Sequence, residues 1–542
     1  MSRMRWNRTR LVDLGMIVVT GLLLGGLLFY GWLLPHFLQQ QTPSAPPSTA
    51  PVVTQALHAD ESSPLRDLTA VPAESEVEQD ADHPLMQGTD EPDGALQTTT
   101  LPTIALTNVA KFAGVGAGDY GFSPRATPPD TSGAVGATQY VQWVNTSFAV
   151  FDKATGKPVL GPEPGNTLWS GFGGDCETHN DGDPIVQYDK AANRWVLTQF
   201  ALKHSQDGAF LQCVAVSATS DATGEYYRYA FEQPNFNDYP KVGIWPDGYY
   251  ISYNMFDGNT FAFLGARACA MDRSRMLKGL SATQVCFQQK QSVASLLPSD
   301  LDGSLAPAKG EPNFFLSLGT NALRLWKFHA DFKTPDKSTF SGPINISVAP
   351  FTLACGGTGW TCIPQNGTSN LLDSLGDRLM YRVAYRRFSD GHETLLVSHA
   401  VTAGKSVGIR WYEIRDPNGK PTPFQQGTFA PDNSFRWISS MAMDQRGNIA
   451  VGYSLSSTSL FPSIGVTGRT PDDPPGALEG ETTLQAGGGA QTGLRRWGDY
   501  SAMTIDPQDD CTFWFTSEYL KATGSFQNWS TEIFAFQFPG CN

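Results

Sequence analysis

The sequence predicts an all-β protein, a seven-bladed β-propeller, and three observations carry this prediction. Glycine and proline are abundant, with 54 and 37 residues, which suits many tight turns. Only 17 % of the 542 residues are charged, and coiled coils and helical bundles need far more. The third observation is a phrase of two apolar strands joined by a polar turn, which recurs along the second part of the chain.

The first residues combine a basic tip with an apolar run. Four arginines within the first ten residues precede a run from Leu14 to Leu34. About 20 apolar residues can cross the hydrocarbon core of a bilayer, and basic residues on the near side only place the N-terminus in the cytoplasm. Residues 1–38 are therefore predicted to be a signal-anchor transmembrane helix that attaches the protein to a membrane. A cleaved signal peptide is the alternative, but the run is long and no A-x-A site follows it.

Residues 39–100 have the composition of a linker. They contain eight prolines, eleven acidic residues, a single arginine and no aromatic residue. Such a segment buries too little apolar surface to offset its chain entropy. We expect a disordered acidic tether that holds the folded part away from the membrane.

Residues 101–542 are predicted to form the propeller. Successive repeats start roughly 50–75 residues apart, which accommodates the four short strands and loops of one blade. The last repeat is one strand short, and residues 103–112 are predicted to supply that strand and close the ring. Six or eight blades are the alternatives. The repeats occupy residues 132–145, 183–200, 238–255, 313–328, 377–400, 436–456 and 499–519.

The cysteines are predicted to form disulfides. Their number, eight, is even, and the folded part is expected in the periplasm or the extracellular space, where disulfides persist. A zinc site is disfavoured because no C-x-x-C pair is present. Neighbouring strands or one short loop bring three of the pairs together, and the fourth pair is what remains. The predicted pairs are Cys269–Cys286, Cys511–Cys541, Cys355–Cys362 and Cys176–Cys213.

Polar residues stand where the innermost strand of several repeats begins. In a propeller these positions surround the central channel, so their side chains would converge. Carboxylates with interspersed cations could bind a cation, a sugar or the charged groups of a protein. The alternative is that the aspartates cap neighbouring turns. The candidate ligand-binding residues are Asp130, Asp183, Asp238, Tyr239, Lys241, Asp377, Arg378, Arg436, Arg496, Asp499 and Tyr500.

A second candidate site is the loop DCETHNDGD at residues 175–183. Its oxygen donors around a glycine suit calcium, which takes six to eight oxygen ligands. Asp175, Asp181 and Asp183 are the predicted calcium ligands, and a plain polar turn is the alternative. No other cofactor is indicated.

Charge and motifs restrict the function. The net charge of −14 argues against nucleic acid as a partner, because phosphate binding requires a basic face. No G-x-S-x-G, H-E-x-x-H or Walker A motif is present, so the sequence leaves open whether the protein is an enzyme.

Four phrases carry a resemblance to known proteins. PPDTSGAVGATQYVQWVN, NDGDPIVQYDKAANRWVLTQF, NDYPKVGIWPDGYYISYNM and RWGDYSAMTIDPQDDCTFWFTSEY look like those of large bacterial extracytoplasmic β-propeller proteins, mostly of unassigned function. The resemblance spans residues 120–541 and implies the fold and a secreted setting. A more distant resemblance to sialidase-like propellers lacks the S-x-D-x-G-x-x-W box and an assignable arginine triad.

Two functions follow as hypotheses. The first is a membrane-anchored binding or scaffolding module for a glycan, a cell-envelope component or a protein. The second is a carbohydrate-active hydrolase or lyase that uses the channel-face aspartate, arginine and tyrosine residues.

Overall fold

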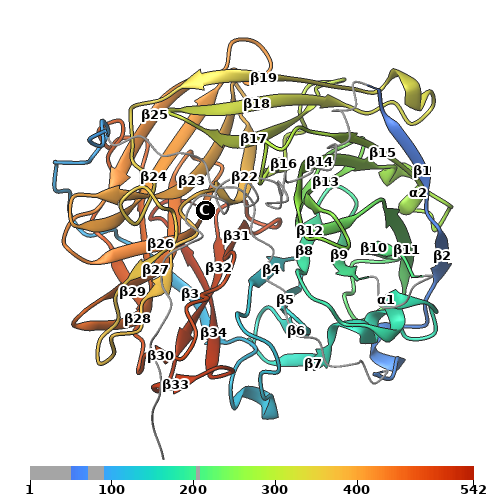
Figure 1. The fold of residues 1–542 in the computed structure, drawn as a ribbon, viewed down its shortest axis with the longest axis horizontal. Coiled ribbons are helices and arrows are strands. Elements are labelled where there is room, and N and C mark those ends of the chain that lie inside the picture. The colour runs from blue at the N-terminus through green and yellow to red at the C-terminus, as the bar shows by residue number, and fades with distance from the viewer. Residues whose placement is uncertain (1–49, 71–90, 203–207, 542) are drawn as a thin grey trace, which may run out of the picture. The chain divides into compact units, whose positions relative to one another are not determined.

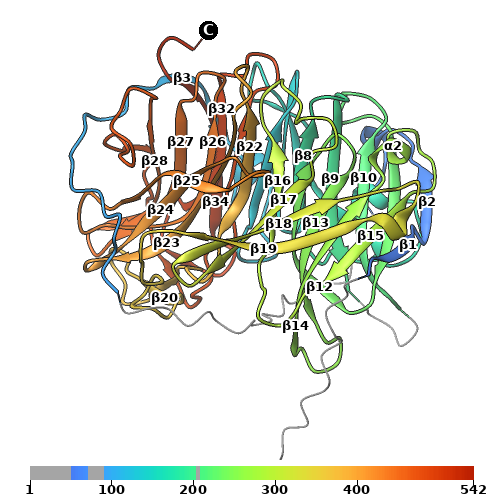
Figure 2. The same cartoon turned by 90° about the horizontal axis from the view of Figure 1, so that it is seen from above.

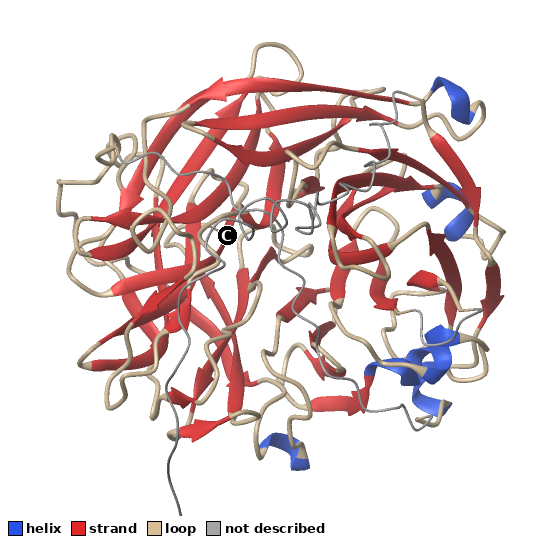
Figure 3. Cartoon of the chain, in the orientation of Figure 1, coloured by secondary structure: helices blue, strands red, loops and turns tan. Residues whose placement is uncertain are grey.

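Antiparallel β-strands make up nearly all the regular structure of the described residues (Figure 3). The computed structural model describes residues 50–70, 91–202 and 208–541, all within one unit, Ala45–Asn542. Its two α-helices have four residues each, α1 (Asp175–Thr178) and α2 (Arg273–Met276), and short 3-10 turns connect some strands. None of the described helices is long and apolar enough to cross a membrane, and the predicted anchor, residues 1–38, lies outside the described residues.

The strands are grouped into sheets in chain order. The first three groups each begin with a strand near the centre and proceed outward (Figure 1). They consist of β4 (Thr131–Val135), β5 (Gln139–Val144), β6 (Ser147–Asp152) and β7 (Pro158–Pro164); of β8 (Ile185–Asp189), β9 (Arg194–Ala201), β10 (Phe210–Ser217) and β11 (Tyr226–Gln233); and of β12 (Phe236–Ile244), β13 (Tyr249–Phe256), β14 (Phe263–Met271) and β15 (Thr283–Gln288).

The remaining groups repeat this plan, and the fourth and fifth are joined into one eight-stranded sheet by a parallel pairing of their innermost strands. They consist of β16 (Leu297–Leu301), β17 (Asn313–Gly319), β18 (Ala322–His329) and β19 (Thr339–Ser347); of β22 (Met380–Arg387), β23 (Glu393–Ala403), β24 (Ser406–Arg415) and β25 (Thr422–Phe429); of β26 (Phe435–Met443), β27 (Ile449–Ser457), β28 (Leu460–Arg469) and β29 (Thr482–Gln485); and of β31 (Ala502–Ile505), β32 (Phe513–Leu520), β34 (Trp529–Gln537) and β3 (Thr107–Ala113). Two short pairs, β20 (Thr361–Ile363) with β21 (Leu372–Asp373) and β30 (Gln491–Thr492) with β33 (Gly524–Ser525), lie outside these groups.

The innermost strands form a closed circle. Each contacts the next in the order β4, β8, β12, β16, β22, β26 and β31, and β31 returns to β4. Figures 1 and 2 show the sheets extending outward from this circle. Antiparallel sheets arranged radially around a common axis define a β-propeller, as the sequence predicts.

Two details of the repeats are decided by the structure. The early segment at residues 103–112 contributes β3, which pairs with β34 at the outer edge of the last sheet, as predicted. In the fourth repeat, however, residues 313–328 form the second and third strands, not the innermost one. The innermost strand is β16, whose sequence LPSDL contains a proline and two polar residues and so lacks the apolar alternation of the other repeats.

The prediction of a disordered tether over residues 39–100 is wrong for part of that segment. β1 (Val52–Gln55) pairs antiparallel with β15, and β2 (His58–Glu61) pairs with β11. Both strands cover the outer edge of a sheet, and Leu65 after them is buried. An open sheet edge offers a row of unpaired backbone groups, so even a polar segment gains hydrogen bonds there without burying much apolar surface.

All eight cysteines are paired, and the four disulfides are those predicted: Cys176–Cys213, Cys269–Cys286, Cys355–Cys362 and Cys511–Cys541. Cys269 and Cys286 face each other across β14 and β15. Cys511 and Cys541 join the start of β32 to the residues after β34, which fixes the end of the chain to the last sheet.

Aromatic side chains fill the spaces between neighbouring sheets. Tyr140 of the first sheet stacks on Trp514 of the last at a centroid distance of 5.3 Å. Trp245, after β12, meets Tyr385 of β22 edge-on at 4.7 Å. Such rings bury about 150–250 Å² each, so the wedges between sheets supply much of the apolar burial that holds the circle together.

Candidate functional site

Most of the predicted channel residues come together at one end of the circle of inner strands. Asp130 directly precedes β4, Asp183 lies just before β8, and Asp499 and Tyr500 lie just before β31. Asp238, Tyr239 and Lys241 lie near the start of β12, where a β-bulge interrupts the pairing with β13. Because the innermost strands run side by side, their starts meet at the axis. We call the following residues the axial cluster: Asp130, Asp183, Asp238, Tyr239, Lys241, Asp377, Arg378, Arg496, Asp499 and Tyr500.

The backbone at three of these positions is left-handed. Asp130, Asp183 and Tyr239 have φ values of 42°, 49° and 55°. Non-glycine residues seldom adopt this conformation, which costs about 1–3 kcal/mol when the surroundings impose it. All three positions lie at or near the start of an innermost strand, and the rest of the sheet must supply the compensating stability.

Lys241 is the centre of the cluster. Its side chain is fully buried, and its Nζ lies 3.3 Å from the ring centroid of Tyr239 and 4.3 Å from that of Tyr500. Its N–H groups donate to the carbonyl oxygen of Pro240 at 3.0 Å. Burial lowers the pKa of Lys241 to about 8, against the opposing effect of the carboxylates, of which Asp183 is the strongest.

The carboxylates shift in the opposite direction for the same physical reason. Burial raises the pKa of Asp183 to about 6, although the positive charge of Lys241 opposes this. Burial and the negative charges of Asp183 and Asp499 raise the pKa of Asp238 well above its usual range. Several acids therefore share one poorly hydrated space with one buried ammonium group, and their protonation is coupled.

Hydrogen bonds tie these acids to the backbone of neighbouring sheets. Asp183 accepts the N–H of Tyr239 through Oδ2 at 3.0 Å, and Asp130 accepts the N–H of Asp499 through Oδ1 at 2.6 Å. The hydroxyl of Tyr500 donates to the carbonyl oxygen of Pro184 at 2.9 Å. The capping alternative is thus fulfilled for two of the aspartates, and each bond also links two sheets.

Two arginines complete the cluster. Arg378 forms an ion pair with Asp377 at 2.8 Å and lies over the ring of Tyr239 at 4.9 Å. Arg496 pairs with Asp499 at 2.9 Å and keeps 20 % of its side chain exposed. Arg496 and the half-buried Asp238 are the members that solvent reaches most easily.

Arg436 does not join the axial cluster. It is buried between the fifth and sixth sheets, where it pairs with Glu481 at 2.5 Å and with Asp432 at 2.9 Å and lies over the ring of Phe429. Arg436 is the second residue of β26, and its two acidic partners lie in the loops that precede β26 and β29. The prediction that it faces the channel is wrong, because the register of the strand directs it away from the axis.

The predicted calcium ligands do not form a metal site. No three His, Cys, Asp or Glu side chains within the described ranges are placed to hold a metal ion. Asp175 begins α1, Asp181 accepts the N–H of Leu202 at 2.6 Å, and Asp183 belongs to the axial cluster. The polar loop is used for backbone capping, so the prediction of calcium at Asp175, Asp181 and Asp183 is wrong.

Sequence reasoning missed Glu518 and Asp373. Glu518 lies in β32, and burial together with the charge of Asp499 raises its pKa well above the usual range. Asp373, in β21, is buried, and burial raises its pKa although the positive charges of Arg496 and Arg378 oppose the shift. Neither residue lies at the start of an innermost strand, which is the position by which the other candidates are recognised in the sequence.

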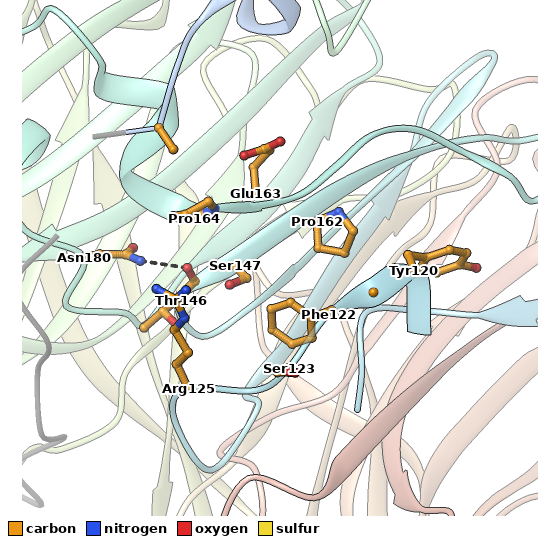
Figure 4. A pocket seen from close by; sticks show the side chains of 12 residues that line it. Tyr120, Phe122, Ser123, Arg125, Thr146, Ser147, Pro162, Glu163, Pro164 and Asn180 are labelled. Carbon is orange, nitrogen blue, oxygen red and sulfur yellow. Dashed lines mark hydrogen bonds between the residues drawn. The ribbon is translucent and has the colours of Figure 1, made fainter. Parts of the chain in front are cut away.

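A groove lies against the first sheet, and Figure 4 shows the side chains that line it. Its volume is about 540 Å³, and it combines aromatic and proline rings with charged and amide side chains. Thr146, in its wall, follows Asn145, whose side chain donates to Asp130 of the axial cluster at 3.3 Å. We call it the Tyr120 groove; it is lined by Ala70, Tyr120, Gly121, Phe122, Ser123, Arg125, Thr146, Ser147, Pro162, Glu163, Pro164 and Asn180.

Fold and site together define a β-propeller with a charged axial cluster. No protein-family model matches the chain, and no curated protein matches its sequence. Among solved structures, the chain is similar to an endo-arabinase from Bacteroides thetaiotaomicron VPI-5482, with 14 % identity, a TM-score of 0.27 and coverage of 54 % of this chain and 95 % of that one.

Two further solved structures are similar over more of the chain. The N-terminal domain of Nup159 has 10 % identity and a TM-score of 0.36, and the match covers 82 % of this chain and 98 % of that one. The WD40 domain of SCAP from fission yeast has 8 % identity and a TM-score of 0.31, with coverage of 74 % and 82 %. Similarities of this size carry no argument about function, which must be argued from the site itself.

Proposed function

We propose that this protein is a seven-bladed β-propeller, held outside the cytoplasm by its N-terminal segment, that binds a glycan or another component of the cell envelope. Seven blades follow if the eight-stranded sheet is counted as two blades joined at the parallel β16–β22 pair. The four disulfides support an oxidising compartment.

The observation that carries the binding function is the Tyr120 groove. Tyr120 is 41 % exposed and presents an aromatic face, which suits the apolar face of a sugar ring. Arg125 and Glu163, also in the wall, have no side-chain hydrogen bond or ion pair with any described residue, so they are available to hydroxyl groups of a ligand. A concave site with aromatic walls and a few polar groups is the usual form of a ligand site.

The axial cluster supports the same proposal. Its five acids (Asp130, Asp183, Asp238, Asp377 and Asp499) outnumber its three cations (Lys241, Arg378 and Arg496). This excess makes the region beside the groove attractive to hydroxyl and ammonium groups rather than to polyanions. A neutral or amino-sugar polymer is thus preferred over an acidic one.

Affinity electrophoresis of the full-length protein in gels that contain dextran, xylan, chitosan or polygalacturonate tests this function. A neutral or amino-sugar polymer should retard the protein, and Tyr120→Ala or Arg125→Ala should abolish the retardation while Tyr120→Phe retains it. Phe424→Ala and Lys405→Ala, exposed residues outside the groove, are the matched controls. Retardation by none of the polymers, or unchanged retardation of Tyr120→Ala, would contradict the proposal.

A carbohydrate-active hydrolase or lyase is the second candidate, and one observation favours it. At neutral pH Asp183, with a pKa of about 6, is mostly a carboxylate that can accept a proton, and Lys241, with a pKa of about 8, is mostly an ammonium group that can donate one. Such shifts are typical of acid–base catalysis.

Turnover is distinguished from binding by its products. The same polymers are incubated with the protein and analysed for new reducing ends and for the ultraviolet absorbance of unsaturated ends. If either product forms, Asp183→Asn and Lys241→Met should stop it without loss of retardation in the gel. If neither forms with polymers that are retarded, the protein binds these polymers without cleaving them.

A further inference from the structure

The inner strands lead from the axial cluster to a cavity at their opposite ends. β8 ends at Asp189, directly before Lys190, and β12 ends at Ile244; β16 ends at Leu301. The cavity at these ends has a volume of about 280 Å³. We call it the Lys190 cavity; it is lined by Tyr188, Asp189, Lys190, Ala191, Ile244, Trp245, Pro246, Arg273, Leu301, Gly303, Ser304, Ala306, Pro507 and Asp510.

The walls of the cavity are largely apolar. Ile244, Trp245 and Leu301 come from two adjacent inner strands and the residue that follows one of them, and Pro507 closes the side next to β31. The indole N–H of Trp245 donates to the carbonyl oxygen of Glu311 at 3.1 Å, which holds the ring in place. These rings and branched side chains form a fixed apolar surface that suits a small aromatic or aliphatic ligand group.

The carboxylates near the cavity are already paired. Asp189 accepts hydrogen bonds from Arg273, at 2.6 and 3.0 Å, and from the hydroxyl of Tyr249, at 2.9 Å. Asp510 accepts two from Arg386, at 2.6 and 2.9 Å.

Behind the wall, the remaining acids are paired in the same way. Asp300 and Asp302 both bind Arg382, at 3.0 and 2.7 Å. The acids around the cavity thus have arginine partners, and a cationic ligand would have to compete with those arginines.

Lys190 differs from the arginines. Its ammonium group makes no hydrogen bond and no ion pair within the part of the chain that the structure describes, although the side chain lines the cavity. The charges of Asp300, Asp302, Asp510 and Arg386 affect the pKa of Lys190 without a hydrogen bond or ion pair to it. A partly buried ammonium group without an acceptor is costly, so the cavity offers three donors to whatever enters it.

We propose that the Lys190 cavity binds a small organic carboxylate, whose apolar body lies against Trp245 and Leu301 and whose acid group accepts hydrogen bonds from Lys190. The volume fits a compact molecule such as a substituted benzoate or a short branched acid, not a polymer. The four acids, three arginines and Lys190 sum to zero charge, so one additional negative charge meets no net repulsion. This site lies at the opposite ends of the inner strands from the axial cluster, and it stands independently of the proposed glycan function.

The protonation of Lys190 gives the site a pH dependence. Burial lowers the pKa of Lys190 to about 8, while the charges of Asp302, Asp510 and Asp300 oppose this and that of Arg386 contributes to it. The ammonium form is therefore present at neutral pH and is lost as the pH rises through 8, and the affinity for a carboxylate should fall over the same interval.

Isothermal titration calorimetry of the full-length protein with benzoate, benzylamine and benzyl alcohol tests the proposal. Benzoate should bind more tightly than the other two at pH 7, and the affinity should fall at pH 9.5. Lys190→Met should weaken benzoate binding by about tenfold or more, which corresponds to the loss of a charge-assisted hydrogen bond. Ala306→Phe, which adds a bulky ring at an exposed position of the cavity lining, should abolish binding.

The matched controls are Lys405→Met and Ala308→Phe, exposed positions that do not line the cavity, and both should bind like the wild type. Circular dichroism melting checks that each variant is folded, and Lys190→Arg provides a second variant that retains the charge and should retain binding. Three results would overturn the proposal: no heat with benzoate, tighter binding of benzylamine than of benzoate, or unchanged benzoate affinity in Ala306→Phe.

Discussion

Oδ1 of Asp130 accepts the backbone N–H of Asp499 at 2.6 Å, although 369 residues separate the two in the sequence. Asp130 stands at the start of the first sheet and Asp499 at the start of the last, so this one bond joins the two ends of the circle of sheets. Asp130 has no exposed surface, and its other oxygen accepts from the side chain of Asn145 at 3.3 Å. The carboxylate is thus part of the closure of the propeller.

Replacement of Asp130 by alanine should therefore destabilise the whole circle. The substitution leaves the N–H of Asp499 without its acceptor in a buried place, which costs about 1–3 kcal/mol. Asp130→Asn keeps an acceptor oxygen at this position and should lose less stability than Asp130→Ala. The midpoints of urea unfolding of the three proteins measure the difference, and equal midpoints for Asp130→Ala and the wild type would show that the bond contributes nothing.

The pH dependence of stability should reveal the raised pKa of Asp183. Its pKa rises on folding from 3.8 to about 6, so its contribution is fully present below pH 4 and is lost as the pH rises through 6. The loss amounts to something on the order of 3 kcal/mol, because one pKa unit corresponds to about 1.4 kcal/mol. Asp183→Asn removes this term and keeps an acceptor for the N–H of Tyr239.

The measurement compares the unfolding free energies of Asp183→Asn and the wild type at pH 4, 5, 6 and 7. The wild type should lose stability relative to the variant between pH 4 and 7, with most of the loss below pH 6 and a shallower slope from pH 6 to 7. Lys241 has the opposite dependence at higher pH, since its folded pKa is lowered to about 8 and its contribution is lost as the pH falls through that value. Parallel curves from pH 4 to 6 would mean that Asp183 is not perturbed.

The disulfides should differ in their contributions. Cys511 and Cys541 are 30 residues apart, whereas Cys355 and Cys362 are seven apart. By the chain-entropy relation, removing the first bond costs about 3–4 kcal/mol and removing the second about 2 kcal/mol. Double alanine variants of each pair, unfolded in guanidinium chloride, test the order. If removing Cys355–Cys362 lowers the unfolding free energy more than removing Cys511–Cys541, loop-closure entropy is not the main contribution of these disulfides to stability.

Residues 52–61 should be protected in solution although their composition is that of a linker. Asp60 pairs with Arg228 of β11 at 2.6 Å, and only 3 % of the arginine side chain is exposed. Hydrogen exchange followed by mass spectrometry should show slow exchange in a peptide that covers β1 and β2. Asp60→Ala should accelerate exchange in β2, while Asp67→Ala, an exposed position on the same segment, should not. Intrinsic exchange rates in the wild type would contradict the pairing.

Local information in the sequence predicts the repeats and three of the disulfides, and the fourth, Cys176–Cys213, is the pair that remains. The phrase at residues 183–200 contains its own turn and two strands, and it forms β8 and β9 as expected. The sequence places the phrase at 313–328 one strand too far inward, because the short and polar β16 carries no apolar alternation. The composition of residues 52–61 predicts a linker. The segment nevertheless forms two edge strands, because edge strands gain backbone hydrogen bonds that do not depend on residue type.

The candidate site was predictable only in outline. That Asp130, Asp183 and Asp499 meet follows from their shared position before an inner strand. That Arg436 turns away, that Glu518 joins them, and that Lys241 is held between two tyrosine rings depend on register and on the packing of different sheets.

The sequence by itself determined the all-β class, the order of the strand groups and the four cysteine pairs, because periodicity, turn residues and spacing are properties of short stretches of chain. Only the tertiary structure decided which charged groups face one another, where the groove and the Lys190 cavity lie, and that residues 52–61 pair with two sheets. These depend on burial and on contacts between residues far apart in sequence, and a side chain acquires a shifted pKa or a partner only when a second segment removes water from it.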